Sequence, residues 1–376
     1  MTLNRVAVLG LGNVGHLAAE LLQDASFDVT GFDERPIPQG AFEVKQFNAQ
    51  DARQLRHELS SVDAVLSCLP YNLNSGVAEA AHEAGIHYFD LTEDVATTKL
   101  TMDLAQSSSG VMAPQCGLAP GFVGIVAADL EAGLDSCRSL RLRAGALPQH
   151  PTGHLGYSFN WSPVGVVNEY LNDCDIIEDG EHKLVPPLER QETVYVDGTK
   201  LEAFTTSGGI GTMCSTYLGR VGNMDYKTLR YPGHVDLMSF FFHELLMKQR
   251  RVLSGDILLH AKPPVQDDVV FVHISAEGTA NDGQLRREFV KAFYPRNLCG
   301  KKRTAISWTT AASAVAVIEL VRRGDMPTQG FLRQEAIPFD LFSTTLTGAL
   351  LARFGQSISG DETVIKESPR EGVSSQ

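Results

Sequence analysis

VAVLGLGNVG, residues 6–15, joins four consecutive apolar residues to three glycines spaced as GxGxxG. A strand that is apolar at every position is typical of a parallel sheet covered on both faces. In such a strand–turn–helix unit the first glycine makes the turn, the second lets the backbone approach a pyrophosphate, and the third lets the helix pack on the strand. The amino end of the helix offers free N–H groups to phosphates. The segment therefore predicts a dinucleotide site that contains Gly10, Gly12, Asn13, Val14 and Gly15.

An acidic residue, Asp33, follows the next expected strand, Val29 to Phe32. It lies about 20 residues after the glycines, where dinucleotide-binding folds place the acid that contacts the ribose hydroxyls. A carboxylate there repels a 2′-phosphate, so we expect NAD rather than NADP. Arg35 keeps NADP open, because a nearby arginine can receive that phosphate. The alternative, a glycine turn in a protein that binds nothing, does not explain why strand, spacing and acid agree.

Short apolar strands and helical patterns alternate up to Gly121, with further strands expected at 64–68, 87–89 and 111–113. Alternating units predict an α/β fold with a doubly wound parallel sheet, a Rossmann domain over residues 1–121. Ligands bind at the carboxyl ends of such strands. Residues that follow a strand are therefore expected to line the cofactor cleft, namely Asn48, Asp51, Ser67, Leu69 and Pro70. The alternative roles are a helix N-cap for Asp51 and an ordinary turn at Pro70.

Longer strands with alternating polarity follow the first domain. Ser139 to Leu147 alternates, and Val269 to Glu277 and Gln284 to Tyr294 flank the turn residues Asn281-Asp282-Gly283, which predicts a β-hairpin. We therefore expect a second, α+β domain for substrate and oligomerisation over residues 122–303. Helices over 304–355, one of them Phe339 to Phe354, are expected to return to the Rossmann domain. The polar residues 356–376 are expected to be a disordered tail.

The composition argues against several classes of partner. A net charge of −13 disfavours nucleic acid and anionic membranes, which attract positive surfaces. The 6 cysteines include no CxxC pair, which favours reduced thiols, and the 11 histidines show no metal-ligand spacing. No apolar run approaches the roughly 20 residues of a membrane span. With no signal-like amino terminus, these features predict a cytoplasmic protein without a metal.

Beyond the glycine turn, several motifs resemble a known family. CGLAPG at 116–121 resembles the GLDPG or GVAPG segment of the saccharopine dehydrogenase family. WSP at 161–163, NEY at 168–170, EAFTTSGG at 202–209 and YKTLRYPGH at 226–234 agree with it, and together they look most like the L-lysine 6-dehydrogenase branch. The resemblance implies a Rossmann domain with an inserted α+β domain, assembled as a homo-oligomer.

Ala119 departs from the reductases of this family, which carry an aspartate inside GLDPG. Loss of that acceptor costs a substrate that needs it about 1–3 kcal/mol, which disfavours saccharopine. The resemblance then implies NAD-dependent oxidative deamination of L-lysine at the 6-amino group, which gives 2-aminoadipate 6-semialdehyde and ammonia. One alternative is a saccharopine- or opine-type reductase that uses NAD(P)H. Another is a dinucleotide-sensing protein without catalysis.

The expected chemistry needs a base, because an amine with a reference pKa of about 10.4 is protonated at neutral pH and cannot release a hydride from its carbon. The catalytic candidates are Asp90, His234 and Tyr71. Arg230 is expected to bind the α-carboxylate with two hydrogen bonds. The other substrate candidates are Asn72, Trp161, Thr206 and Ser207. Each has a structural alternative: Asp90 can bond loop amides, Trp161 can be core, and the others can form turns.

Overall fold

β1 (Arg5–Leu9) lies in the interior of a seven-stranded sheet in the computed structural model, which describes residues 3–352. The predicted tail 356–376 and the last residues of the 304–355 segment lie outside the described residues. The strand order is β3-β2-β1-β4-β5-β6-β17, with every pair parallel. The other strands of this sheet are β2 (Asp28–Asp33), β3 (Glu43–Gln46), β4 (Ala64–Ser67), β5 (His87–Asp90), β6 (Val111–Ala113) and β17 (Gly330–Phe331).

Helices cover both faces of this sheet. Val6 and Val8 of β1 share a core with α1 (Asn13–Asp24) and α10 (Ala305–Arg323). Ala7 and Leu9 point to the other face, where α2 (Ala52–Leu59), α3 (Tyr71–Ala84) and α4 (Val95–Ala105) lie. All four β1 residues are at most 1% exposed. The prediction of a doubly wound sheet is confirmed, and its order places the cofactor crevice between β1 and β4, where the order reverses.

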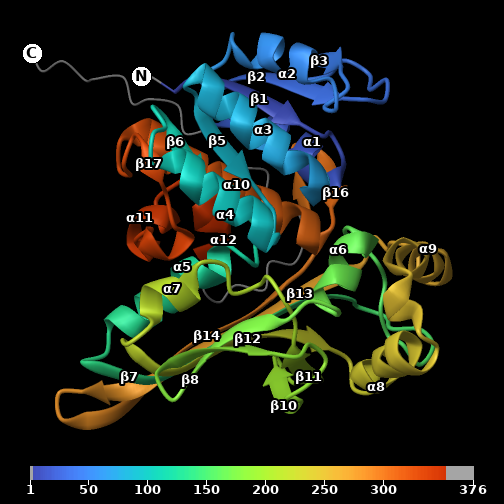
Figure 1. Ribbon diagram of the computed structural model, residues 1–376, viewed down its shortest axis with the longest axis vertical. Coiled ribbons are helices and arrows are strands. Elements are labelled where there is room, and N and C mark those ends of the chain that lie inside the picture. The colour runs from blue at the N-terminus through green and yellow to red at the C-terminus, as the bar shows by residue number, and fades with distance from the viewer. Residues whose placement is uncertain (1–2, 353–376) are drawn as a thin grey trace, which may run out of the picture.

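A second, eight-stranded mixed sheet forms the other domain (Figure 1). Its path is β10-β11-β12-β7-β13-β14, with β8 and β9 attached to β12, and β7 and β12 run parallel. The strands are β7 (Ser136–Pro148), β8 (Cys174–Glu178), β9 (Glu181–Val185), β10 (Glu192–Val196), β11 (Thr199–Thr205), β12 (Val221–Arg230), β13 (Asp268–Ala280) and β14 (Gly283–Phe293). The β13–β14 hairpin turns at Asn281 and Asp282, both at positive φ, as a type I′ turn requires. The α+β expectation for this domain is confirmed.

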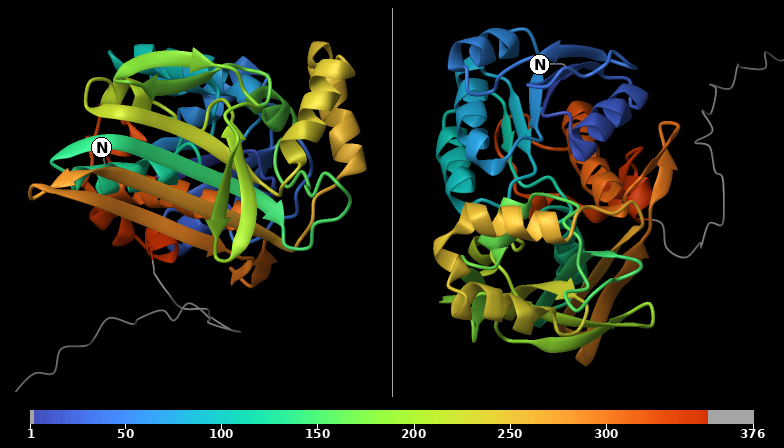
Figure 2. Two further views of the ribbon diagram at one scale, coloured as in Figure 1. Left: turned by 90° about the horizontal axis from the view of Figure 1, so that it is seen from below. Right: turned by 90° about the vertical axis from the view of Figure 1, so that its right-hand side faces the viewer.

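Short helices accompany the second sheet. α5 (Phe122–Ala132) and α7 (Met213–Tyr217) lie between the two sheets in Figure 1, whereas α8 (His234–Ser239) and α9 (Arg251–Ala261) stand at one side. α6 (Pro163–Glu169) packs against α9. Between α8 and α9 the chain forms the short turns η1 (Phe240–Glu244) and η2 (Met247–Gln249). Figure 2 shows the second sheet from below, with the first domain behind it.

The C-terminal segment lies against the first domain. After the small hairpin β15 (Arg296–Leu298) and β16 (Lys301–Arg303), α10 packs on α1, and β17 joins the edge of the parallel sheet. α10 has the length and hydropathy of a membrane span, but 83% of that window is buried in the fold, as in a core helix. The next turns are η3 (Gln334–Ala336) and α11 (Phe339–Ser343).

The prediction of a single helix over Phe339 to Phe354 is wrong. The described part contains α11 and α12 (Gly348–Ala352), separated by a polar connection at 344–347. Thr345 donates its hydroxyl to the carbonyl of Phe342 and accepts from the N–H of Gly348. Threonine hydroxyls that bond the local backbone compete with helical hydrogen bonds, and this explains the break.

Candidate active site

The three glycines after β1 occupy three different environments. Gly10 has a φ of +85°, and a β-carbon on it would lie 2.9 Å from the carbonyl oxygen of Cys68. A β-carbon on Gly15 would lie 1.9 Å from the carbonyl oxygen of Gly10. At Gly12, by contrast, a β-carbon would meet no atom within 4 Å. Gly10 and Gly15 are therefore required by the turn and its packing, while the space beside Gly12 fits the close approach of a pyrophosphate.

Asp33, at the end of β2, is held as an anion beside this turn. Its carboxylate accepts the N–H of Leu11 at 2.8 Å and the guanidinium of Arg35 through two contacts of 2.8 and 3.1 Å. The hydrogen bond from Arg35 is the main reason that the pKa of Asp33 is lowered. The Arg35 side chain itself is 63% exposed. The carboxylate and the cation therefore lie together at the position expected for the adenosine ribose.

Other expected cofactor residues lie at the same sheet edge, but several are used locally. Asp51 caps α2 by accepting the N–H groups of Arg53 and Gln54, and Asn48 accepts the N–H of Gln50. The hydroxyl of buried Ser67 donates to Asn74. Their side chains therefore have structural roles in this structure. Four other expected residues flank the crevice and form no such side-chain hydrogen bonds with the described residues. They belong to the first turn of α1 and to the segment after β4: Asn13, Val14, Leu69 and Pro70.

Asp90 is fully buried and its carboxylate is already satisfied. Oδ2 accepts the Tyr88 hydroxyl, and Oδ1 accepts the N–H groups of Thr92 and Gln115. Burial raises the pKa of Asp90 to about 6. A carboxylate that holds two loops by three hydrogen bonds is poorly placed to take a proton from substrate. The contacts of Asp90 therefore favour the structural alternative over the expected base.

Arg230, at the end of β12, is 2% exposed and makes no ion pair with any residue between 3 and 352. Nε donates to the Tyr170 hydroxyl, and Nη1 donates to Thr228 and to the carbonyl of Leu229. Nη2 makes no hydrogen bond to the described residues. Glu202 lies directly opposite on β11, but its carboxylate accepts the N–H groups of the turn before α8. We predicted that Arg230 binds a carboxylate with two hydrogen bonds. In this structure only Nη2 of its guanidinium remains free for that contact.

His234 holds Arg230 in position rather than carrying a proton. The His234 Nδ1 lies 3.0 Å from the carbonyl oxygen of Leu155, so this nitrogen is the protonated donor. Its Nε2 can then accept the Tyr170 hydroxyl, which itself accepts Nε of Arg230. Burial and the Arg230 charge lower the pKa of His234 to about 3, so the ring is neutral. The expected proton relay and carboxylate contact at His234 are not supported.

The sequence reasoning missed two carboxyl groups of this region, of which Glu169 interacts with Arg230, and Glu93 interacts with Glu169. Glu169, the last residue of α6, is 7% exposed, and Glu93, in the loop after β5, is partly buried. Neither carboxyl forms an ion pair with any residue between 3 and 352. Burial is the main cause that raises the pKa of Glu93 to about 7 and that of Glu169 to about 8. Arg230 opposes the shift at Glu169, and Glu93 adds to it.

Further polar groups in this region lack partners. The Thr206 hydroxyl is buried without a hydrogen bond, and so is the Tyr157 hydroxyl, although Trp161 lies near it. A buried hydroxyl without a partner is rare in proteins and points to a missing ligand or water. Ser207 donates its N–H to the carbonyl of Glu169, so this loop is fastened to α6. Tyr71, partly buried, and Asn72, exposed, form the first turn of α3 across the crevice.

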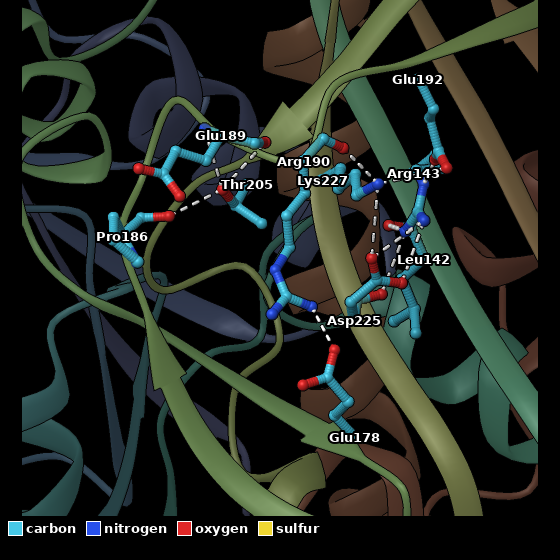
Figure 3. A network of polar contacts seen from close by, with 10 residues as sticks. All are labelled: Leu142, Arg143, Glu178, Pro186, Glu189, Arg190, Glu192, Thr205, Asp225 and Lys227. Atoms are coloured by element: carbon cyan, nitrogen blue, oxygen red, sulfur yellow. Dashed lines mark hydrogen bonds and ion pairs between the residues drawn. The ribbon is translucent and has the colours of Figure 1, made fainter.

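The opposite face of β12 carries a separate, saturated network (Figure 3). Lys227, three residues before Arg230, points to the other side of the strand, as the two-residue period of a strand requires. Its Nζ contacts Glu192 and Asp225 and donates to the carbonyl of Arg190. Buried Arg143 pairs with the same two carboxylates. Lys227 is therefore buried and paired, and it has no contact with Arg230 among the interactions of this network.

The two raised carboxyl pKa values predict how the stability of the ligand-free protein depends on pH. Between pH 6.5 and 8 both glutamates are ionised in the unfolded chain, whereas in the folded chain, with pKa values of about 7 and 8, each keeps a protonated fraction that shrinks as pH rises. The folded state therefore binds more protons, and stability falls as pH rises. His234 has the opposite effect, but only below its unfolded pKa of about 6.5. We expect the midpoint of thermal unfolding to fall by about 2–4 °C over this interval.

Scanning calorimetry at several pH values checks this expectation. Glu169→Gln and Glu93→Gln should each flatten the dependence, since the amide does not titrate. Glu178→Gln, on the exposed end of β8, is the matched control and should leave the slope unchanged. A pH dependence identical in all four proteins would contradict the proposed protonation of Glu93 and Glu169.

Comparisons with known proteins agree with the two-domain fold. A family model described as the saccharopine dehydrogenase NADP binding domain matches residues 6–113, and one described as the saccharopine dehydrogenase C-terminal domain matches residues 117–353. Mitochondrial alpha-aminoadipic semialdehyde synthase of Mus musculus is 24% identical over 267 residues, which are 64% of this chain and 28% of that protein. The Rattus norvegicus protein of the same name is 26% identical over 197 residues. The chain thus spans about a quarter of the length of these relatives.

A similar solved structure is apo saccharopine dehydrogenase (L-Glu forming) from Saccharomyces cerevisiae. The TM-score is 0.69 at 15% sequence identity, and the match covers 88% of this chain and 94% of the other. At this identity the likeness shows that the two chains share a fold. It agrees with the parallel sheet followed by a mixed sheet described above.

Proposed function

This chain belongs to the saccharopine dehydrogenase family, and from that premise we propose that it is an NAD-dependent dehydrogenase that oxidises the 6-amino group of L-lysine. The family is one of amino-acid dehydrogenases and reductases, and the chain is an oxidoreductase of that kind. The choice of substrate rests on one observation, the charge pattern around Arg230. Arg230, a cation whose Nη2 is free of hydrogen bonds to the described residues, interacts with Glu169, and Glu169 interacts with Glu93.

That pattern complements a substrate with one carboxylate and two amines. The free edge of Arg230 suits the α-carboxylate, and the two carboxyls suit two ammonium groups. Saccharopine or 2-oxoglutarate brings further carboxylates, which would be buried beside Glu93 and Glu169 without a cation. An uncompensated buried charge is strongly unfavourable. Ala119, which replaces the acceptor of the reductases, points the same way.

The residues present fit a nicotinamide dinucleotide. The space beside Gly12 and the amino end of α1 suit the pyrophosphate, and Asp33 suits the ribose hydroxyls. When bound, the dinucleotide supplies the acceptor for the hydride that leaves the substrate carbon. The rest of the chemistry falls to the chain: Arg230 orients the substrate, buried Tyr157 and Thr206 offer hydrogen bonds, and a carboxyl must accept the proton of the reacting ammonium. Because Asp90 is occupied, we place that last role on Glu93.

Initial rates test the proposal directly. Purified protein with L-lysine and NAD is expected to form NADH and release ammonia without a keto acid. Rates with NADH, 2-oxoglutarate and the semialdehyde test the reductase alternative, and the two activities should differ by at least tenfold. Failure of L-lysine to support NADH formation would refute the substrate assignment. Tight NADH binding without turnover of any amino acid would instead favour the dinucleotide-sensing alternative.

The preference for NAD over NADP is expected to depend on Asp33. Asp33→Ala removes the charge that repels a 2′-phosphate and frees Arg35 to receive it, so the ratio of kcat/KM for NADP to that for NAD should rise by about 10–100-fold. Steady-state kinetics with both cofactors measure this ratio. Asp63→Ala, which removes an acid at the amino end of the same sheet, is the control and should leave it unchanged. A wild-type preference for NADP would contradict the role given to Asp33.

A further inference from the structure

Three charged groups of the proposed substrate site come from both domains. Glu169 interacts electrostatically with both Arg230 and Glu93. Glu169 also ends α6, the helix whose Gly165 packs against the Glu93 carboxyl, so it connects the other two groups. Glu93 comes from the dinucleotide domain, three residues after the carboxyl end of β5, and Arg230 comes from the end of β12 in the other domain. The series runs from the dinucleotide domain to the second sheet.

Two glycines of the second domain make room for Glu93. A β-carbon on Gly165 of α6 would lie 2.9 Å from Oε1 of Glu93 and 2.6 Å from the ring of Trp161. A β-carbon on Gly208 would lie 2.8 Å from the β-carbon of Glu93. The Glu93 side chain is thus enclosed between α6 and the loop after β11. This packing holds its carboxyl near the boundary between the domains, on the side of the cofactor crevice.

Independent features show that this region is built for a ligand. The hydroxyl of Thr206, a residue that is 2% exposed, has no hydrogen-bond partner among the described residues. The guanidinium of Arg230 lies 4.6 Å from the centre of the Tyr157 ring, so this buried ring packs beside Arg230. The arrangement is therefore more than a cluster of acidic residues.

We propose that Glu169 binds the α-ammonium of the substrate beside Arg230, and that Glu93 accepts the proton of the distal, reacting ammonium. This assignment rests on the proposed function and deepens it, because it gives the substrate one orientation. The α-amino acid end faces the second sheet, and the distal amine faces the dinucleotide domain. The pocket would then select amino acids that carry a second amine at the end of an unbranched chain.

The proton transfer is simple to balance. An N–H bond of the distal ammonium breaks, an O–H bond forms on the ionised carboxylate of Glu93, and the nitrogen keeps the electron pair as a neutral amine. Glu93 faces Asp90 and Asp94 on its own loop and Glu169 on α6, which disfavour its ionisation. Glu169 faces Arg230, Glu93 and Tyr157. Because burial keeps Glu169 largely protonated and Glu93 partly protonated near pH 7, binding of a cationic substrate should release protons to the solvent.

Calorimetric binding to the NADH-loaded protein tests this without turnover. L-Norleucine keeps the α-ammonium and carboxylate but lacks the distal amine, whereas 6-aminohexanoate keeps the distal amine and lacks the α-ammonium. Glu169→Gln is expected to lower the affinity for L-norleucine at least tenfold and to change the affinity for 6-aminohexanoate by no more than about twofold. Glu93→Gln should do the reverse. Titrations in buffers of different ionisation enthalpy should show proton release with L-lysine, reduced in each variant. Glu178→Gln serves as the control and should match the wild type.

Two results would overturn the assignment. One is that both variants lose affinity for both ligands alike, and the other is that neither variant changes either affinity. Lysine binding with the expected split between variants, but without NADH formation from NAD, would refute the proposed function and leave the assignment standing. NADH formation from lysine without the split would do the opposite.

Discussion

Arg230→Gln is expected to lower kcat/KM for the amino acid by about 10²–10³-fold, because the substrate carboxylate would be buried without a cation. Affinity for NADH should change little, since Arg230 belongs to the second domain. The stability of the ligand-free protein should fall by only about 1–3 kcal/mol, because the variant loses the hydrogen bonds of Arg230 to Tyr170, Thr228 and the carbonyl of Leu229 but no ion pair with the described residues. Steady-state kinetics and thermal unfolding measure the two effects separately.

Lys227→Gln is the matched control on the same strand. Lys227 is as buried as Arg230, but it contacts Glu192 and Asp225 on the opposite face. Its loss should lower stability by about 1–3 kcal/mol, because a charged hydrogen-bond network is broken, while activity per folded molecule is kept. The two variants should therefore differ in activity, because kcat/KM per folded molecule falls only in Arg230→Gln. If Arg230→Gln reduced stability and left kcat/KM unchanged, Arg230 would be a structural cation like Lys227 and not the carboxylate site.

The first domain was largely predictable from the sequence, because its signals are local. The glycine spacing, the apolar β1 and the acid after β2 lie within residues 6–33, and each reports a backbone requirement that no distant residue can change. What the sequence does not indicate there is how individual side chains are used. Asp51, Asn48 and Ser67 lie at strand ends as expected. Their side chains form hydrogen bonds within a helix cap, within a turn and to a neighbouring helix, respectively.

The substrate site was less predictable, because the residues that form it are far apart in the sequence. Glu93 and Glu169 are ordinary acids in the sequence, and only the fold removes them from water and from counter-ions. Glu169 lay inside the NEY motif that carried the resemblance, and Glu93 lay three residues beyond the carboxyl end of β5. A search of every strand end for acids would have included Glu93, but not its burial. The same burial makes His234 neutral, which the sequence does not indicate.

Gly12→Val and Gly15→Val are expected to fail in different ways. At Gly12 the φ of −72° suits any residue, and a β-carbon would meet no atom within 4 Å. The Gly12→Val protein should therefore fold with an unfolding midpoint near that of the wild type. The added side chain would occupy the space beside the backbone that the pyrophosphate needs. Affinity for NADH should then fall by at least about 100-fold, a loss of roughly 3 kcal/mol.

Gly15→Val should instead damage the fold, because its β-carbon would lie 1.9 Å from the carbonyl oxygen of Gly10 and 3.0 Å from the β-carbon of Cys68. Relief requires α1 to move away from β1 and β4, and overpacking of this kind costs about 1–3 kcal/mol or more. Fluorescence titration with NADH and thermal unfolding of both variants distinguish the two failures. If Gly12→Val bound NADH normally, the pyrophosphate would not lie against this turn. The proposed contact between Asp33 and the ribose would then fail as well, because it assumes the same cofactor position as the contact between the pyrophosphate and the glycine turn.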